Sequence, residues 1–309
     1  MTITINNKND PAYQSMFDAL IQEVFGFSFQ PWFEYKLWDD NYESYSIVED
    51  GRMLSNICIY KSDLLIRGQK FPAIQFGAVA TAKNARGRGL SRMLMEHVLS
   101  LYPNRPAYLA ANGGVVDFYP KFGFRQVQTY RAMLALPSLR PIPSLRAQRS
   151  NPEKVQHLDC YGKNTIGMTE NATKLHINDE LVTHALQTRG TFSNLVDCTN
   201  TRSIQMFHLI MQYYDSIYHI PHLNALVIAQ QTDSKLFLAD VISKNPIILD
   251  QVLAALPFTG YDTIEFGFCP DWLGVTPNWT PTDPVRDPFF IRGNWNLPEK
   301  FRFPATSET

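Results

Sequence analysis

Residues 79–95 of the 309-residue chain read VATAKNARGRGLSRMLM. The apolar run that ends at Thr81 predicts a strand, and apolar positions at helical spacing over residues 90–101 predict an amphipathic helix. A turn rich in arginine and glycine joins the two. The backbone amides at a helix start have no intrahelical partners, and the helix dipole favours negative charge there. Since Gly87 and Gly89 let a ligand approach the backbone closely, this stretch predicts an anion-binding turn.

The same turn also has a purely structural interpretation, because a strand-to-helix turn can need glycine for geometry alone. Arg86, Arg88 and Arg92 add positive charge around it and favour the anion. A P-loop is excluded because no Lys-Ser or Lys-Thr follows the glycines. A dinucleotide fingerprint lacks its third glycine, since that position is Arg92.

A second motif follows the next predicted strand, which ends at Asn112. Tyr119 comes seven residues later, and Gly123-Phe124 follows it. Together with the turn at 86–91, this pattern resembles the GNAT superfamily of acetyl-CoA-dependent N-acetyltransferases, whose pyrophosphate loop is Q/R-x-x-G-x-G/A. The resemblance covers about residues 10–136 and looks most like the multidomain branch of the family, which carries extra C-terminal domains. The sequence departs from this motif at its last position, where Ser91 replaces the family's glycine or alanine, a small residue in place of another.

The resemblance implies acetyl-CoA as co-substrate and a role for each matching residue. Backbone amides at the helix start would hold the pyrophosphate, and the strand edge would pair with the pantetheine arm, as a peptide adds to a sheet. Asn112 would contact that arm, and Tyr119 would act as the catalytic acid that protonates the departing thiolate. The implied cofactor-binding residues are Val79, Ala80, Thr81, Arg86, Gly87, Arg88, Gly89, Leu90, Ser91, Arg92 and Asn112. No metal is expected.

The general base is left open. Many family members have a glutamate on the central strand, but residues 71–81 offer Gln75 and no carboxylate. The alternatives are a water chain, a group from the C-terminal domain, or one of four carboxylates: Glu34, Asp39, Asp40 and the terminal carboxylate of Thr309.

The loop over residues 31–42 is the expected wall of the acceptor site. Its aromatic side chains can cage a cationic amine, and its carboxylates can attract one. The equally weighted alternative is that Trp32, Trp38 and Tyr42 simply pack against the sheet.

The length of the chain predicts two domains or one large one, and the break in pattern at 137–153 favours two. We expect an α+β fold. The first domain, at 1–136, should contain a GNAT-type mixed, mostly antiparallel sheet flanked by helices. A linker rich in proline and arginine at 137–153 should lead to a second α+β domain at 154–309. Residues 223–268 follow the strand and helix order of a GNAT half, so the second domain is either a degenerate copy or an unrelated α+β fold. No glycine turn leads into its helix after Val241, so no pyrophosphate site is expected there. The proline-rich tail from 270 is expected to cover the surface without adding a layer.

Composition narrows the functional classes. Hydrophobic residues make up 45% of the chain and charged residues 18%, which excludes a disordered or collagen-like chain. The cysteines at 58, 160, 198 and 269 form no CxxC pair and read as reduced thiols of a cytoplasmic protein. Neither a secretory signal nor a membrane span is expected. The pair His219 and His222 has no cysteine or glutamate at ligand spacing, so zinc is not expected either.

The net charge of −1 makes a nucleic-acid partner a poor interpretation. It combines 17 basic and 12 acidic residues up to position 150 with 11 basic and 17 acidic residues beyond it. The sequence therefore predicts an N-acetyltransferase that moves an acetyl group from acetyl-CoA to a small-molecule or peptide primary amine, by direct attack in a ternary complex. The alternative is a non-catalytic acyl-CoA-binding sensor or scaffold. The acceptor and the oligomeric state are left open.

Overall fold

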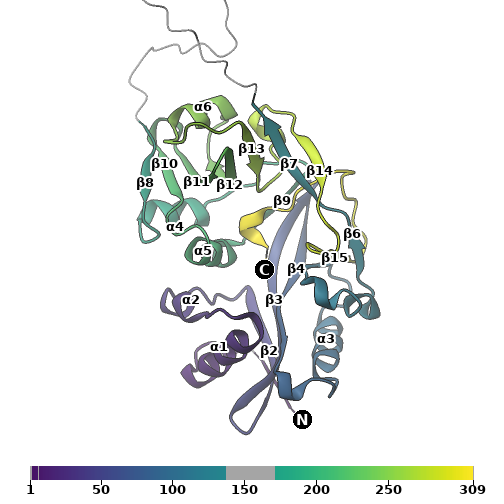
Figure 1. Ribbon diagram of the computed structural model, residues 1–309. Helices are drawn as coiled ribbons and strands as arrows, with labels where there is room; N and C mark the ends of the chain where they lie inside the picture. Colours follow the sequence, from purple (N-terminus) through teal and green to yellow (C-terminus); the bar gives the residue numbers. More distant parts are fainter. Residues whose placement is uncertain (1, 6, 137–170, 309) are drawn as a thin grey trace, which may run out of the picture.

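The computed structural model describes residues 2–5, 7–136 and 171–308 (Figure 1). The linker predicted at 137–153 lies outside these ranges, and so do Cys160 and Thr309. The described chain forms two sheets flanked by helices. Within the described residues, no helix combines the length and the apolar character needed to cross a bilayer.

The first sheet is antiparallel apart from one parallel pair, β4 with β5. A further strand, β9 (Val196–Thr199), pairs with the far end of β3. The main strands, in their order across the sheet, are β1 (Ile3–Ile5), β2 (Tyr42–Glu49), β3 (Arg52–Ile66), β4 (Gln69–Thr81), β5 (Ala107–Ala110), β15 (Phe289–Arg292) and β6 (Arg125–Val127).

The second sheet also has a single parallel pair, β12 with β13. Its strands, in order, are β8 (Thr173–Leu175), β10 (Ile217–Ile220), β11 (Ala225–Thr232), β12 (Lys235–Ser243), β13 (Thr263–Phe266), β7 (Tyr130–Ala135) and β14 (Asn278–Pro281).

The two sheets follow the same plan. In each, two helices separate the first strand from the second, and one helix separates the two strands of the parallel pair. These helices are α1 (Pro11–Phe25), α2 (Gln30–Glu34) and α3 (Leu90–Leu101) in the first domain, and α4 (Glu180–Gln187), α5 (Arg202–Met211) and α6 (Leu249–Ala255) in the second. This match favours the degenerate copy over an unrelated fold.

The two sheets exchange one strand each. β7 pairs with β13 and β14 of the second sheet, and β15 from the C-terminal tail pairs with β5 and β6 of the first. The expectation that the tail only covers the surface was therefore wrong, because the tail contributes β14 and β15 to the sheets. Residues 125–135, which sequence assigns to the first domain, supply β6 to the first sheet and β7 to the second. Alternating apolar residues reveal a strand, but they do not reveal which sheet edge it joins. The chain crosses the predicted boundary at residue 136 in both directions.

Local sequence explains the helix that opens the first domain. Asp10 caps α1 by accepting a hydrogen bond from the Ala12 amide, and Pro11 supplies a first residue that needs no donor. Gly26 ends the helix at φ 80°, a left-handed conformation that glycine adopts without strain. The buried side chains of Phe17 and Ile21 then fix α1 onto the sheet.

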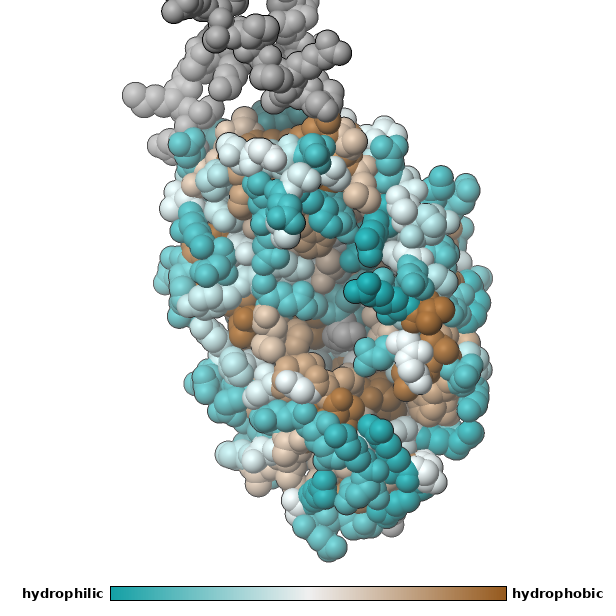
Figure 2. All heavy atoms as spheres, in the orientation of Figure 1, coloured by the Kyte–Doolittle hydropathy of each residue, from teal (hydrophilic) through white to brown (hydrophobic). Residues whose placement is uncertain are grey.

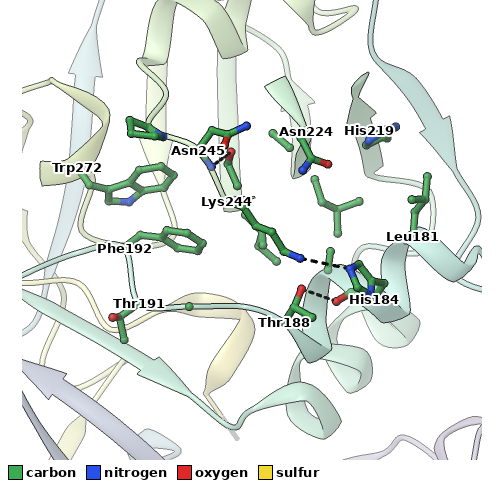
Figure 3. A pocket seen from close by; sticks show the side chains of 17 residues that line it. Leu181, His184, Thr188, Thr191, Phe192, His219, Asn224, Lys244, Asn245 and Trp272 are labelled. Atoms are coloured by element: carbon green, nitrogen blue, oxygen red, sulfur yellow. Dashed lines mark hydrogen bonds between the residues drawn. The ribbon is translucent and has the colours of Figure 1, made fainter. Parts of the chain in front are cut away.

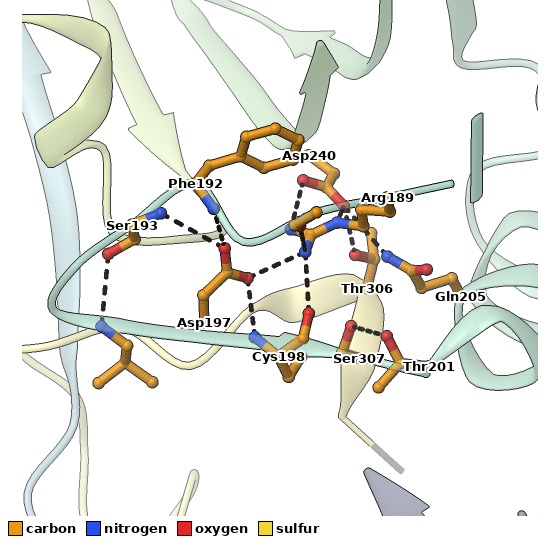
Figure 4. Close-up of polar contacts among 12 residues, drawn as sticks. Arg189, Phe192, Ser193, Asp197, Cys198, Thr201, Gln205, Asp240, Thr306 and Ser307 are labelled. Carbon is orange, nitrogen blue, oxygen red and sulfur yellow. Dashed lines mark hydrogen bonds and ion pairs between the residues drawn. The ribbon is translucent and has the colours of Figure 1, made fainter. Parts of the chain in front are cut away.

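A buried ion network joins the second domain to the C-terminal turn (Figure 4). The Arg189 guanidinium lies 3.0 Å from Asp197 Oδ1 and 3.3 Å from Asp240 Oδ2, and all three side chains are at most 4% exposed. Thr306 in the last turn, η6 (Ala305–Ser307), donates to Asp240 at 3.1 Å. Because an unpaired buried charge is costly, this network fixes the turn against β12.

The tail also comes very close to the loop after β5. A Cβ added at Gly113 would stand 2.3 Å from the Val285 carbonyl oxygen, whereas nothing lies within 4 Å of one added at Gly114. Gly113→Ala is therefore expected to push the tail away and to destabilise the fold by about 1–3 kcal/mol. The measurement is chemical denaturation, with Gly114→Ala as the matched control. Equal stability of the two variants would contradict this seating of the tail.

Candidate active site

A cleft of about 640 Å³ opens where β4 and β5 separate. The two strands pair only at Ile74–Ala107 and Gln75–Tyr108, and β4 then continues alone to Thr81. In Figure 2 apolar side chains gather around a hollow between the two halves of the molecule. A parallel pair that separates in this way exposes the inner edge of a strand to a ligand.

The glycine turn lies at the mouth of this cleft. Gly87 and Gly89 have φ near 78° and 77°, and both have open space around them, so the turn needs glycine for its backbone conformation. Gly89 is the N-cap of α3, and no side chain caps the helix. The first-turn amides of α3 therefore keep their hydrogen-bonding capacity for a ligand.

Six of the predicted site residues line the cleft together: Val79, Thr81, Arg86, Ser91, Asn112 and Tyr119. The others do not line it. Ala80 and Leu90 are buried in the core, while the remaining four lie in the exposed turn and in the first turn of α3: Gly87, Arg88, Gly89 and Arg92.

The three arginines of the turn differ in their partners. Arg88 pairs with Glu49 at 3.2 Å, and Arg92 pairs with Glu96 at 3.7 Å. Within the described residues Arg86 makes no ion pair; its Nε donates to the Thr81 carbonyl at 3.4 Å, and its side chain lines the cleft. We therefore expect Arg86 to contribute most of the side-chain charge that a bound anion meets.

A β-bulge shapes the wall of the cleft. The ladder between β3 and β4 shifts register after Asn56, which leaves Ala78 and Val79 without ladder partners. Ala78 has a φ of 47°, and the Asn56 side chain donates to its carbonyl at 3.0 Å. Both bulge residues line the cleft. Sequence reasoning missed this bulge, because it depends on pairing with a distant strand rather than on a local motif.

Tyr119 is held in an aromatic cluster. Its side chain is 5% exposed, and its ring lies 5.3 Å from that of Phe118 and 5.4 Å from that of Phe290, measured between centroids. Phe290 belongs to β15, so the exchanged strand supports the predicted catalytic residue. Burial raises the pKa of Tyr119 to about 12, so the hydroxyl is protonated at neutral pH.

Asp39, Asp40 and Glu34, the described carboxylates that sequence offers as general bases, lie outside the cleft. Asp39 accepts hydrogen bonds from the amides of Asn41 and Tyr42 and from the Tyr60 hydroxyl, so it organises its own loop. Its burial raises its pKa. Asp40 pairs with Lys8, and Glu34 accepts from a neighbouring glutamine. Among the described residues, no carboxylate lines the cleft.

The loop at 31–42 contributes some of its aromatic side chains to the cleft and buries others. Trp32 and Tyr42 line the cleft, but Trp38 is buried and donates from its indole to the Tyr42 carbonyl. The rest of this wall is apolar and includes α5 of the second domain, where Phe207 stacks on Phe29 with 5.0 Å between ring centroids. Of this loop, aromatic side chains line the cleft, whereas Glu34, Asp39 and Asp40 do not.

Residues 8–127 match the model of the acetyltransferase (GNAT) domain. The chain contains a GNAT acetyltransferase domain. This family transfers acyl groups and generally uses acetyl-CoA as co-substrate. No curated protein matches the chain in sequence.

Solved structures extend the fold likeness to both domains. Eis1 from Mycobacterium abscessus shares 14% identity over 94% of this chain and 73% of its own, with a TM-score of 0.53. A GCN5-related N-acetyltransferase from Anabaena variabilis shares 14% identity over 94% and 72%, with a TM-score of 0.54. A probable N-acyltransferase from Enterococcus faecalis shares 12% over 94% and 73%, with a TM-score of 0.51. At these identities the likeness is one of fold.

The glycine turn yields a test of ligand binding. Gly87→Ala places a Cβ at positive φ beside the start of α3 and is expected to weaken coenzyme A binding by about tenfold, since strain of about 1–2 kcal/mol displaces the turn. Gly51→Ala is the matched control, because Gly51 also has a positive φ (70°) and open surroundings but lies in the β2–β3 hairpin. Calorimetric titration measures both. Equal affinity of the two variants would contradict the assignment of the turn.

Proposed function

We propose that this protein transfers an acetyl group from acetyl-CoA to a primary amine, by direct attack of the amine on the thioester in a ternary complex. The observation that carries the proposal is the convergence of three features in one cleft: the glycine turn, the bulge of β4 and the buried Tyr119. The glycine turn suits a pyrophosphate, the bulge suits the thioester carbonyl, and Tyr119 suits the leaving thiolate.

In this proposal the cofactor runs along β4. The pyrophosphate binds the first-turn amides of α3 and the side chain of Arg86. The pantetheine arm pairs with the free edge of β4, and Asn112 contacts it from the opposite side. The bulge places the backbone of Ala78 and Val79 at the wall of the cleft, where in this proposal it lies beside the thioester oxygen as that oxygen gains negative charge.

The chemistry then requires a group at the sulfur. The amine nitrogen attacks the carbonyl carbon, a tetrahedral intermediate forms, and the C–S bond breaks as the amine loses a proton. A thiol has a pKa of about 8.5, so a tyrosine with a pKa of about 12 does not fully protonate a free thiolate. Tyr119 acts by donating a hydrogen bond to the sulfur while charge develops there, and the proton that the amine releases balances the reaction.

The apolar wall indicates the acceptor. A polycation bound there would bury charges without partners, which costs several kcal/mol. An amine with an aromatic or alkyl body instead fits a wall made by five side chains: Phe25, Phe27, Phe29, Ile204 and Phe207. With no carboxylate in the described lining, the amine must enter already neutral or lose its proton through water.

The alternative is a non-catalytic acyl-CoA sensor. It is favoured by Gln75, a fully buried residue on β4 where a carboxylate base would stand. The two hypotheses differ in a measurable way: the sensor binds acetyl-CoA but acetylates no member of a panel of aromatic, alkyl and polycationic amines.

Tyr119→Phe tests the role of the hydroxyl. It is expected to lower kcat by about 10²-fold while coenzyme A still binds, since the ring and its packing are kept. Tyr218→Phe is the control, because Tyr218 is also buried but lies in the second domain. A Tyr119→Phe variant that turns over its amine as fast as wild type would show that the hydroxyl takes no part.

Phe207→Ala tests the acceptor wall. Removing a ring that stacks on Phe29 is expected to reduce kcat/KM for phenethylamine by about tenfold, because apolar contact with the acceptor is lost. Coenzyme A affinity should not change. Met211→Ala, an exposed position on the same helix, is the control. A normal kcat/KM for Phe207→Ala would place the acceptor elsewhere.

A further inference from the structure

A second pocket, of about 700 Å³, lies in the second domain, and the proposed function does not use it (Figure 3). It is formed by one face of α4, the loop at 190–192, the start of β11, the end of β12 and Trp272 after β13. The end of β12 and the segment after β13 correspond to the end of β4 and the segment after β5, which form the first cleft. The volume is in the range of pockets that hold small organic ligands.

An acyl-CoA does not fit this pocket. The residues that lead from β12 toward α6 are Ser-Lys-Asn-Pro instead of the glycine turn, and the Ile248 amide at the start of α6 already donates to the Gln251 side chain. The gap between β12 and β13 is also filled. The Ala305 amide of the C-terminal turn donates to the Gly267 carbonyl at 2.7 Å, and a Cβ added at Gly267 would meet Ala305 at 3.1 Å. No path is left there for a pantetheine arm.

The titratable side chains that line the pocket are a lysine and two histidines. Lys244, His184 and His219 line it, and no aspartate or glutamate does. Lys244 Nζ lies 3.4 Å from His184 Nε2, and Figure 3 shows the two side chains meeting inside the pocket. In the described part of the chain Lys244 makes no ion pair. This ammonium is solvent-exposed and lies beside an imidazole, so it can donate to an anion that enters the pocket.

An aromatic surface lies across the pocket from these donors. The rings of Phe192 and Trp272 stack with 4.8 Å between centroids and 27° between planes, and Figure 3 shows both rings at the opposite side of the pocket from His184. The Arg189 guanidinium lies 5.1 Å from the Phe192 ring centroid, and this cation–π contact helps to hold the ring in place. The buried side chains of Leu226 and Ile242 add apolar lining.

We propose that this pocket is a binding site for a small organic anion, with one carboxylate on a planar, apolar body. The carboxylate accepts a hydrogen bond from the Lys244 ammonium, which the contact with His184 Nε2 holds in the pocket. The body lies against Trp272 and Phe192. The site is separate from the acyl-transfer cleft and does not require that cleft to be active.

The test uses two probes of the same shape, 2-naphthoate and its uncharged amide 2-naphthamide. Calorimetric titration of the full-length protein is carried out with coenzyme A at saturation, which occupies the first cleft. Naphthoate is expected to bind at least about tenfold more tightly than naphthamide, the ratio that one charge-assisted hydrogen bond supplies.

Three variants assign the site. Lys244→Gln is expected to remove the preference for naphthoate, and Trp272→Ala to weaken both probes. Lys300→Gln makes the same charge change at an exposed residue outside the pocket and is expected to leave both affinities unchanged.

Several outcomes overturn the proposal: equal affinity for the two probes, no binding of either at millimolar concentration, or a preference that survives Lys244→Gln. If Arg86→Gln lost the preference for naphthoate, the anion would be assigned to the first cleft, and the proposal would be overturned as well. Repeating the titration with Tyr119→Phe keeps the result independent of acetyl transfer.

Discussion

The two sheets exchange β7 and β15, and this exchange joins the two halves of the chain. β15 pairs with β5 on one side and β6 on the other, so the first sheet contains a strand from residues 289–292 in its interior. Just before it, the Pro288 carbonyl accepts from the Ala111 amide, beside Asn112. Phe290 packs on Tyr119. The C-terminal segment is thus part of the candidate active site, and the site is complete only when both halves of the chain have folded together.

The features that sequence predicted are the local ones. The strand, glycine turn and helix at 79–101 follow one another directly, and the register from Asn112 to Tyr119 lies within a single loop, so neighbouring residues alone determine them. Long-range features escaped prediction. The bulge at Ala78 depends on pairing with β3, and the contribution of Phe207 to the cleft depends on how α5 packs against the first domain. The carboxylates after Trp32 were expected near the acceptor, but they do not line the cleft, and Asp39 and Asp40 have partners on β3 and near the N-terminus.

The two copies of the fold have diverged in a physically consistent way. The first keeps a glycine turn, a capless helix start and an open gap between its parallel strands. The second has lost the glycines, and its own C-terminal turn fills the equivalent gap, held there by Thr306 and the buried pair of Arg189 and Asp240. What remains open in the second copy is a pocket with different chemistry, lined by Lys244 and histidines. One topology thus provides a candidate acyl-transfer cleft in one half and a separate candidate anion site in the other.

Hydrogen exchange of the intact protein, followed by mass spectrometry, is the most direct test of whether β15 is an interior strand of the first sheet. If β15 is an interior strand, amides at 289–292 will exchange as slowly as those of β5 at 107–110, because both open only when the sheet unfolds. Added coenzyme A will slow exchange in both segments together. Rapid exchange at 289–292 beside a protected β5 would contradict the account, since the tail would then be a surface segment and Tyr119 would not depend on it.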